Sequence, residues 1–211
     1  QPVPRAELNK SLLFMSPRVS SPPEKIPPLA VMIENEVTTR PWLAGLSHAD
    51  IVYEALAEGG VTRFLAIFLD KKYEGLMGPV RSARPYYLDW AYEYNGVYAH
   101  VGGSPELMAR VRKEPVHDVD QFFNEDYYWR SNVGLTAREH TMFTSGKMLR
   151  KLIDDKKIEW EPAEGFPWRA KIMDIEKFAS VPGTEISIDF GFPSYRVGYT
   201  YDPVRERYMR T

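Results

Sequence analysis

Short apolar runs alternate with helix-start signals between residues 29 and 159, and this alternation restricts the possible folds. Leu29–Ile33 is a continuous apolar run typical of a buried strand. The run 96–101 leads into Gly102–Pro105, where two glycines precede a Ser-Pro pair that favours the start of a helix. Strands that alternate with helices form layered folds. We therefore predict an α/β (α+β) domain with a mixed sheet flanked by helices.

Two further segments of this region carry the same signals. Residues 82–94 predict a helix capped by Ser82, with aromatic residues spaced along its buried stripe. Residues 140–156 predict a short strand and then a helix capped by Thr144 or Ser145. Each helix would follow a strand closely, as the layered fold requires.

Two β-prone runs, 51–58 and 61–69, are separated by a pair of glycines and predict a hairpin with a two-residue turn. This turn would place Leu56 opposite Arg63. One face of the hairpin would then carry two acidic side chains around one guanidinium. Such a face suits either a structural ion pair or a paired acid and base. The shared face would carry Glu54, Glu58 and Arg63.

The two ends of the chain differ from this α/β region. Residues 1–28 contain seven of the 17 prolines, a density that opposes regular structure and predicts an extended tether. Beyond Trp160 only β-prone runs follow, at residues 170–173, 184–190, 195–201 and 205–210. We therefore expect three parts: a tether over 1–28, the α/β domain over 29–159, and a smaller, incomplete all-β module over 160–211.

Charge and cysteine content exclude several classes of function. Lys and Arg number 27 and Asp and Glu number 29, which gives a net charge of −2 and no general attraction to nucleic acid. The chain has no cysteine, so it forms no disulfide, thiolate metal site or thiol nucleophile. No two of the four histidines have the i, i+4 spacing of a zinc helix. We expect no metal and no cofactor.

Two segments favour an anion. The segment Gly78–Pro85 brings two arginines and a serine to a predicted helix start, where free N–H groups attract phosphate or carboxylate. The glycine pair before Pro105 also lets the backbone approach a ligand. Alternatively, the two arginines pair with acids and hold elements together. The candidate ligand-binding residues are Arg63, Arg81, Ser82, Arg84, Gly102, Gly103 and Ser104.

Four side chains are candidates for acid and base catalysis. Two histidines stand beside strand-to-helix transitions, where ligands gather in α/β sheets. The hairpin carboxylates could act with them, and all four could equally form structural hydrogen bonds. The candidate catalytic residues are His100, His140, Glu54 and Glu58.

An aromatic cluster lies between His100 and His140. It has two parts, Phe122-Phe123 and Tyr127–Arg130. Aromatic faces beside polar groups suit the stacking of carbohydrate or the binding of a peptide. The alternative is that the cluster anchors a long loop to the domain.

Four ordered motifs resemble the YerB-like bacterial lipoprotein family. They occur at residues 28–35, 46–64, 78–85 and 98–104, and the likeness is strong over about residues 28–150 and looser over the β module. The resemblance implies a secreted, two-domain protein without an established activity, held at the membrane by a lipid on an N-terminal cysteine. This chain lacks that cysteine, and it has Glu139-His140-Thr141 where the family tends toward Pro-His-Asn.

These observations lead to one functional hypothesis and two alternatives. The first is an extracytoplasmic lipoprotein that binds a small anionic or cell-envelope-derived ligand. The second is a hydrolase or transferase acting on envelope glycan or phosphate esters. The third is a protein-interaction scaffold that binds a partner through the open edge of the β module.

Overall fold

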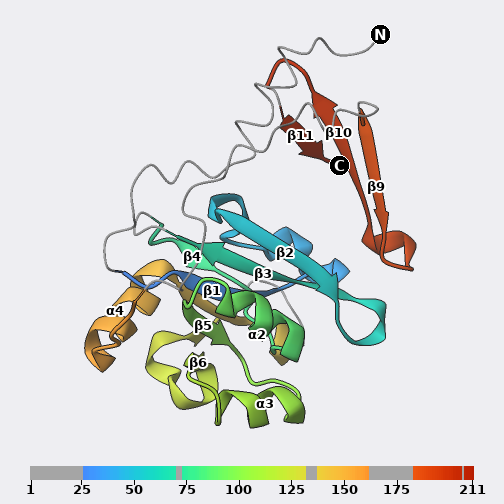
Figure 1. Ribbon diagram of the computed structural model, residues 1–211. Helices are drawn as coiled ribbons and strands as arrows, with labels where there is room; N and C mark the ends of the chain where they lie inside the picture. The colour runs from blue at the N-terminus through green and yellow to red at the C-terminus, as the bar shows by residue number, and fades with distance from the viewer. Residues whose placement is uncertain (1–25, 70–72, 132–136, 162–182, 206) are drawn as a thin grey trace. The chain divides into compact units, whose positions relative to one another are not determined.

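The computed structural model describes residues 26–69, 73–131, 137–161, 183–205 and 207–211 (Figure 1). These residues belong to two compact units, one within Pro23–Phe166 and the other including Pro167–Thr211. Each unit is described by itself.

The first unit is built on a five-stranded mixed sheet. Its strands are β1 (Leu29–Glu34), β2 (Ile51–Leu56), β3 (Thr62–Phe68), β5 (Val97–His100) and β6 (His117–Asp120). They lie side by side in the order β2-β3-β1-β5-β6 (Figure 1). β3 is antiparallel to β1 and β2, whereas β1, β5 and β6 run parallel. The predicted mixed sheet is confirmed.

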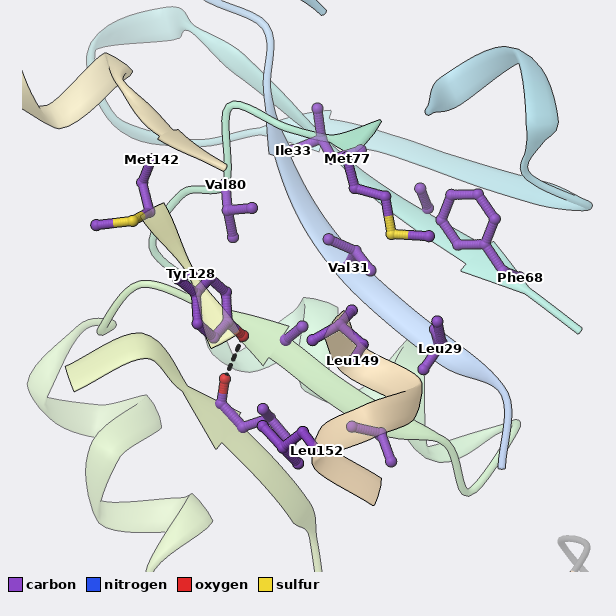
Figure 2. Packing of buried hydrophobic residues seen from close by; sticks show 14 of the residues in the cluster. Leu29, Val31, Ile33, Phe68, Met77, Val80, Tyr128, Met142, Leu149 and Leu152 are labelled. Carbon is purple, nitrogen blue, oxygen red and sulfur yellow. Dashed lines mark hydrogen bonds between the residues drawn. The ribbon is translucent and has the colours of Figure 1, made fainter. Parts of the chain in front are cut away.

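Both faces of the sheet are covered at its central strand, since every residue of β1 is buried. Leu29, Val31 and Ile33 share one core with Leu149 of helix α4 (Gly146–Lys156), and Figure 2 shows this packing. Tyr128 closes the core, and its hydroxyl donates to the Val119 carbonyl over 2.6 Å (Figure 2). Tyrosine can be buried here because its hydroxyl finds an acceptor.

Two more helices, α2 (Pro85–Tyr92) and α3 (Pro105–Val111), contribute buried side chains to the first unit. The Tyr87 hydroxyl of α2 donates to the Arg63 carbonyl of β3 over 2.8 Å. Helices therefore flank the sheet, as predicted.

A smaller antiparallel sheet accompanies the main one. Its strands are β4 (Leu76–Met77), β7 (Trp129–Arg130) and β8 (Met142–Ser145), in the order β4-β8-β7. The described 3-10 turns are Val37–Trp42, Leu46–His48, Glu58–Gly60, Gln121–Phe123, Glu125–Tyr127, Arg138–His140 and Pro193–Tyr195.

Two of the predicted helix caps are confirmed. The Ser104 side chain accepts from the Leu107 N–H at the start of α3, and Ser145 accepts from the Met148 N–H at the start of α4. The predicted cap at Ser82 is wrong, because α2 begins at Pro85 and Arg84 precedes it. Three residues before it pair with other segments instead: Val80 with Ile33, Arg81 with Met32, and Ala83 with the turn at Gly102 and Gly103.

The predicted register of the hairpin is also wrong. Leu56 lies opposite Thr62, and Arg63 lies opposite Ala55. The turn is longer than two residues, because the Ala57 N–H donates to the Val61 carbonyl around a three-residue 3-10 turn. A slip of one residue moves a side chain to the other face of the sheet. Glu54 and Arg63 therefore do not share a face.

The second unit contains a separate antiparallel sheet. Its strands are β9 (Glu185–Asp189), β10 (Arg196–Asp202) and β11 (Arg207–Arg210), in the order β11-β10-β9. These are three of the four strands predicted for the C-terminal part. The fourth, at 170–173, lies outside the described residues, as do residues 1–25 of the predicted tether.

We expect the core on the α4 side of the sheet to dominate the stability of the first unit. Leu149→Ala should lower the free energy of unfolding by about 2–5 kcal/mol, since it leaves a cavity beside the fully buried β1. Leu56→Ala is the control, because Leu56 is 44% exposed, and it should cost less than about 1 kcal/mol. Urea unfolding followed by tryptophan fluorescence measures both. Equal losses in the two variants would contradict this packing.

Candidate functional site

The candidate site lies at one edge of the main sheet. Because β1, β5 and β6 are parallel, their last residues, Glu34, His100 and Asp120, lie at the same edge. The chain before α2 crosses this edge. There the Arg81 N–H donates to the Met32 carbonyl, and the Arg81 carbonyl accepts from Val101, both over 3.1 Å. Ligands of α/β sheets commonly bind at such an edge.

A buried carboxylate organises this edge. Glu34 is only 3% exposed, and its Oε1 lies 3.1 Å from Arg81 Nε. Its Oε2 lies 2.7 Å from His140 Nδ1, within hydrogen-bonding distance. Burial raises the pKa of the Glu34 carboxyl, and the two partners offset part of that rise. Arg81 Nη1 also donates to the Glu139 carbonyl over 2.8 Å.

A cavity of about 340 Å³ opens beside this cluster. Three of its lining residues are arginines, whereas Glu139 is its single acidic residue. Among the described residues, no ion pair joins Glu139 to any of these arginines. The cavity is lined by Arg81, Ser82, Val101, Phe122, Arg130, Arg138, Glu139 and Met142.

Two of the three arginines lack an acidic partner in the part of the chain that the structure describes. Arg130 lies on β7 opposite Met142, and its Nη1 donates to the Arg138 carbonyl and, over 3.2 Å, to Thr141 Oγ1. The Arg138 guanidinium forms no hydrogen bond or ion pair there. Residues 132–136 contain no acid. Burial and the positive charge of Arg138 lower the pKa of Arg130.

The remaining predicted arginines have different roles. Arg84 Nε and Arg63 Nη2 both form ion pairs with Glu58, and Arg63 Nη1 donates to the Ser82 carbonyl over 2.9 Å. The contact of Arg84 is therefore the ion pair with an acid that the sequence analysis gave as the alternative to ligand binding. Of the residues Arg81, Ser82, Arg84 and Arg63, only Arg81 and Ser82 line the cavity.

His100 is completely buried beneath the glycine turn. Its Nδ1 lies 2.8 Å from the Gly102 carbonyl and its Nε2 lies 2.7 Å from Asp118 Oδ1. His100 therefore supports the turn and does not line the cavity. Ser104 caps α3, and Gly103 lies where a Cβ would meet the Leu107 side chain.

Glu54 lies apart from these groups. Its Oε1 accepts from Asn35 over 3.1 Å and from Thr62 over 2.8 Å. The four predicted catalytic side chains are thus held by separate partners, and none lines the cavity. Within the described ranges, no group of three or more His, Asp or Glu could hold a metal ion.

The sequence from residue 17 to residue 159 matches the family model described as "Protein of unknown function (DUF3048) N-terminal domain". The chain belongs to this family. A relative, "Putative lipoprotein YerB" from Bacillus subtilis (strain 168), is 32% identical over 190 residues. That alignment covers 87% of this chain and 54% of the relative, so the chain spans about half of its length.

The crystal structure of the YerB protein from Bacillus subtilis has the same fold. It matches with a TM-score of 0.69 and 29% identity, over 88% of this chain and 61% of that one. The resemblance of the sequence to the YerB-like family is thereby confirmed. The family description assigns no activity. A proposal about function therefore depends on the geometry and the charges of the cavity.

For this member of the DUF3048 family, sequence reasoning missed Arg130 and Arg138. Arg130 ends the aromatic cluster noted above, and Arg138 follows it after eight residues. The signal available was an excess of basic over acidic residues between 130 and 140, where Glu139 is the only acid. That signal was too weak to indicate that both side chains line one cavity with Arg81.

The buried Glu34 predicts a specific pH dependence. Because folding raises its pKa, the folded protein binds this proton more tightly than the unfolded chain does. The resulting stabilisation is complete below the ordinary pKa of 4.5 and is lost as the pH rises through the folded pKa. Glu34→Gln cannot titrate, so its stability relative to the native chain should increase as the pH rises from below 4.5 through the folded pKa of Glu34.

Glu58→Gln is the matched control, with the opposite sign. The hydrogen bond from Arg84 lowers the pKa of Glu58, so the native chain gains stability as the pH rises. The Glu58→Gln variant should therefore lose stability relative to the native chain over the same range. Urea unfolding at a series of pH values measures both differences. A loss for Glu34→Gln with rising pH would contradict the assignment.

Proposed function

We propose that this protein is an extracytoplasmic lipoprotein that binds an anionic, envelope-derived ligand in the arginine-lined cavity. One observation carries this proposal: Arg130 and Arg138 line the same cavity without an acidic partner among the described residues. Arg81, by contrast, is already paired with Glu34. The ligand would therefore interact chiefly with Arg130 and Arg138.

Electrostatics support an anion at this position. Two like charges in one partly enclosed cavity destabilise each other, and burial together with the positive charge of Arg138 lowers the pKa of Arg130. A phosphate or carboxylate placed between them would replace repulsion with two attractive pairs. Guanidinium groups bind such anions with two parallel hydrogen bonds, each stronger than a bond between neutral groups.

The cellular location is proposed from the relative. The Bacillus subtilis protein carries the description of a lipoprotein, and this chain shares its family over most of its own length. In the part of the chain that the structure describes, no helix is long and apolar enough to span a membrane. We propose that a lipid on an N-terminal cysteine, which this chain does not contain, holds the protein at the membrane.

Lipid attachment can be tested in cells. The protein produced from its own complete gene should incorporate labelled palmitate and be recovered in the membrane fraction. Protease added to protoplasts should degrade the protein, since the domain would lie outside the membrane. Unlabelled protein in the cytosolic fraction would contradict the proposed location.

Ligand binding can be tested with inorganic phosphate at low ionic strength. Phosphate should raise the melting temperature of the native chain, and Arg138→Ala should weaken phosphate binding about tenfold or more, because one charge-assisted contact is lost. Arg84→Ala is the control, since Arg84 is paired with Glu58 and does not line the cavity. Calorimetry gives the affinities. Unchanged binding by Arg138→Ala, with loss in Arg84→Ala, would contradict the proposal.

The two alternatives stay predictions. An enzyme would need acid and base groups facing one ligand, whereas the four candidate side chains bond to separate partners. A scaffold would use the exposed strand β9, which lies at one edge of its sheet and whose five residues are all exposed. Neither feature points to a particular substrate or partner.

A further inference from the structure

An exposed aromatic ring lies beside the arginines of the cavity. Phe122 lines the cavity, and its side chain is 61% exposed. It follows β6 directly, in the 3-10 turn Gln121–Phe123. The ring therefore starts from a strand end and not from a long loop.

Two contacts position Phe122, one of its backbone and one of its ring. Its backbone N–H donates to Asp120 Oδ1 over 3.2 Å, and the same oxygen accepts from the Gly102 N–H over 2.8 Å. The ring also lies close to Gly102, where an added Cβ would come within 3.0 Å of Phe122 Cε2. Gly102 has a φ of +61°, a conformation that suits glycine. The glycine turn therefore makes room for the ring on one side, and the ring stays exposed on the other.

The cavity suits a small ligand with both charged and apolar parts. Its volume of about 340 Å³ is near the lower end of the range of roughly 300–1,000 Å³ for small-molecule sites. Val101 and Met142 add apolar wall to that of Phe122, while Arg130 and Arg138 supply the charge. A single ring with one acidic group would use both kinds of surface.

We propose that the ligand carries its anionic group on a ring that stacks on Phe122. The guanidinium groups of Arg130 and Arg138 would bind the anionic group. This inference rests on the proposed function and adds the chemistry of the rest of the ligand. Two kinds of ring fit this position: an aromatic ring, which stacks through its flat face, and a sugar ring, which packs its apolar C–H groups on an aromatic side chain.

The experiment compares phosphate monoesters with and without a ring. Methyl phosphate has no ring, glucose 1-phosphate carries a sugar ring, and phenyl phosphate carries an aromatic ring. For the native chain, at least one of the two ring-bearing esters should bind about threefold to tenfold more tightly than methyl phosphate. Titration calorimetry at constant low ionic strength gives the three dissociation constants.

Phe122→Ala should remove this preference and leave the binding of methyl phosphate unchanged. Phe123→Ala is the matched control, because Phe123 is its chain neighbour, is 73% exposed and does not line the cavity. That variant should keep the preference. A thermal melt of each variant confirms that it is folded.

The outcomes separate this inference from the proposed function. A preference for glucose 1-phosphate or for phenyl phosphate that only Phe122→Ala removes supports the inference and identifies the kind of ring. Equal binding of all three esters, or a preference that survives Phe122→Ala, overturns it while anion binding stands. No binding of any ester overturns both proposals.

Discussion

The buried carboxylate of Glu34 is the constraint on which the site depends. A carboxylate removed from water is costly unless charged or hydrogen-bonding groups surround it. Glu34 meets this requirement with Arg81 and His140, which come from distant parts of the chain. It thereby fixes the segment before α2 and the turn before β8 at the end of β1. The cavity lies between these two segments.

The same principle divides the arginines of this region into two groups. Glu34 pairs with Arg81, and Glu58 pairs with Arg63 and Arg84. Arg130 and Arg138 lack such a partner among the described residues. Anion binding would therefore depend on which guanidinium groups the fold leaves unpaired, and not on the number of arginines near a helix start. The helix that the sequence predicted to start at Ser82 is α2. It begins three residues later and contributes little to the cavity.

Local signals in the sequence predicted much of the fold. Apolar runs, the Ser104 and Ser145 caps, and the strands of the C-terminal sheet depend on neighbouring residues and were found. The predicted register of the hairpin was wrong because a three-residue turn sets the register. The spacing of the glycines does not reveal the geometry of that turn.

The site was harder to predict, because long-range contacts form it. His140 and Glu34 are 106 residues apart, and Arg81 meets the Glu139 carbonyl across 58 residues. The periodic patterns of a sequence do not predict contacts between residues so far apart in the chain. Arg81 and Ser82 were identified by their residue types, whereas Arg130 and Arg138 become candidates only when the fold places them in one cavity with Phe122.

A crystal structure of the chain soaked with phenyl phosphate tests the central claim most directly. We expect phosphate density within hydrogen-bonding distance of the Arg130 and Arg138 guanidinium groups, inside the cavity. Phosphate bound instead beside Arg63 and Arg84, with the cavity empty, would contradict it.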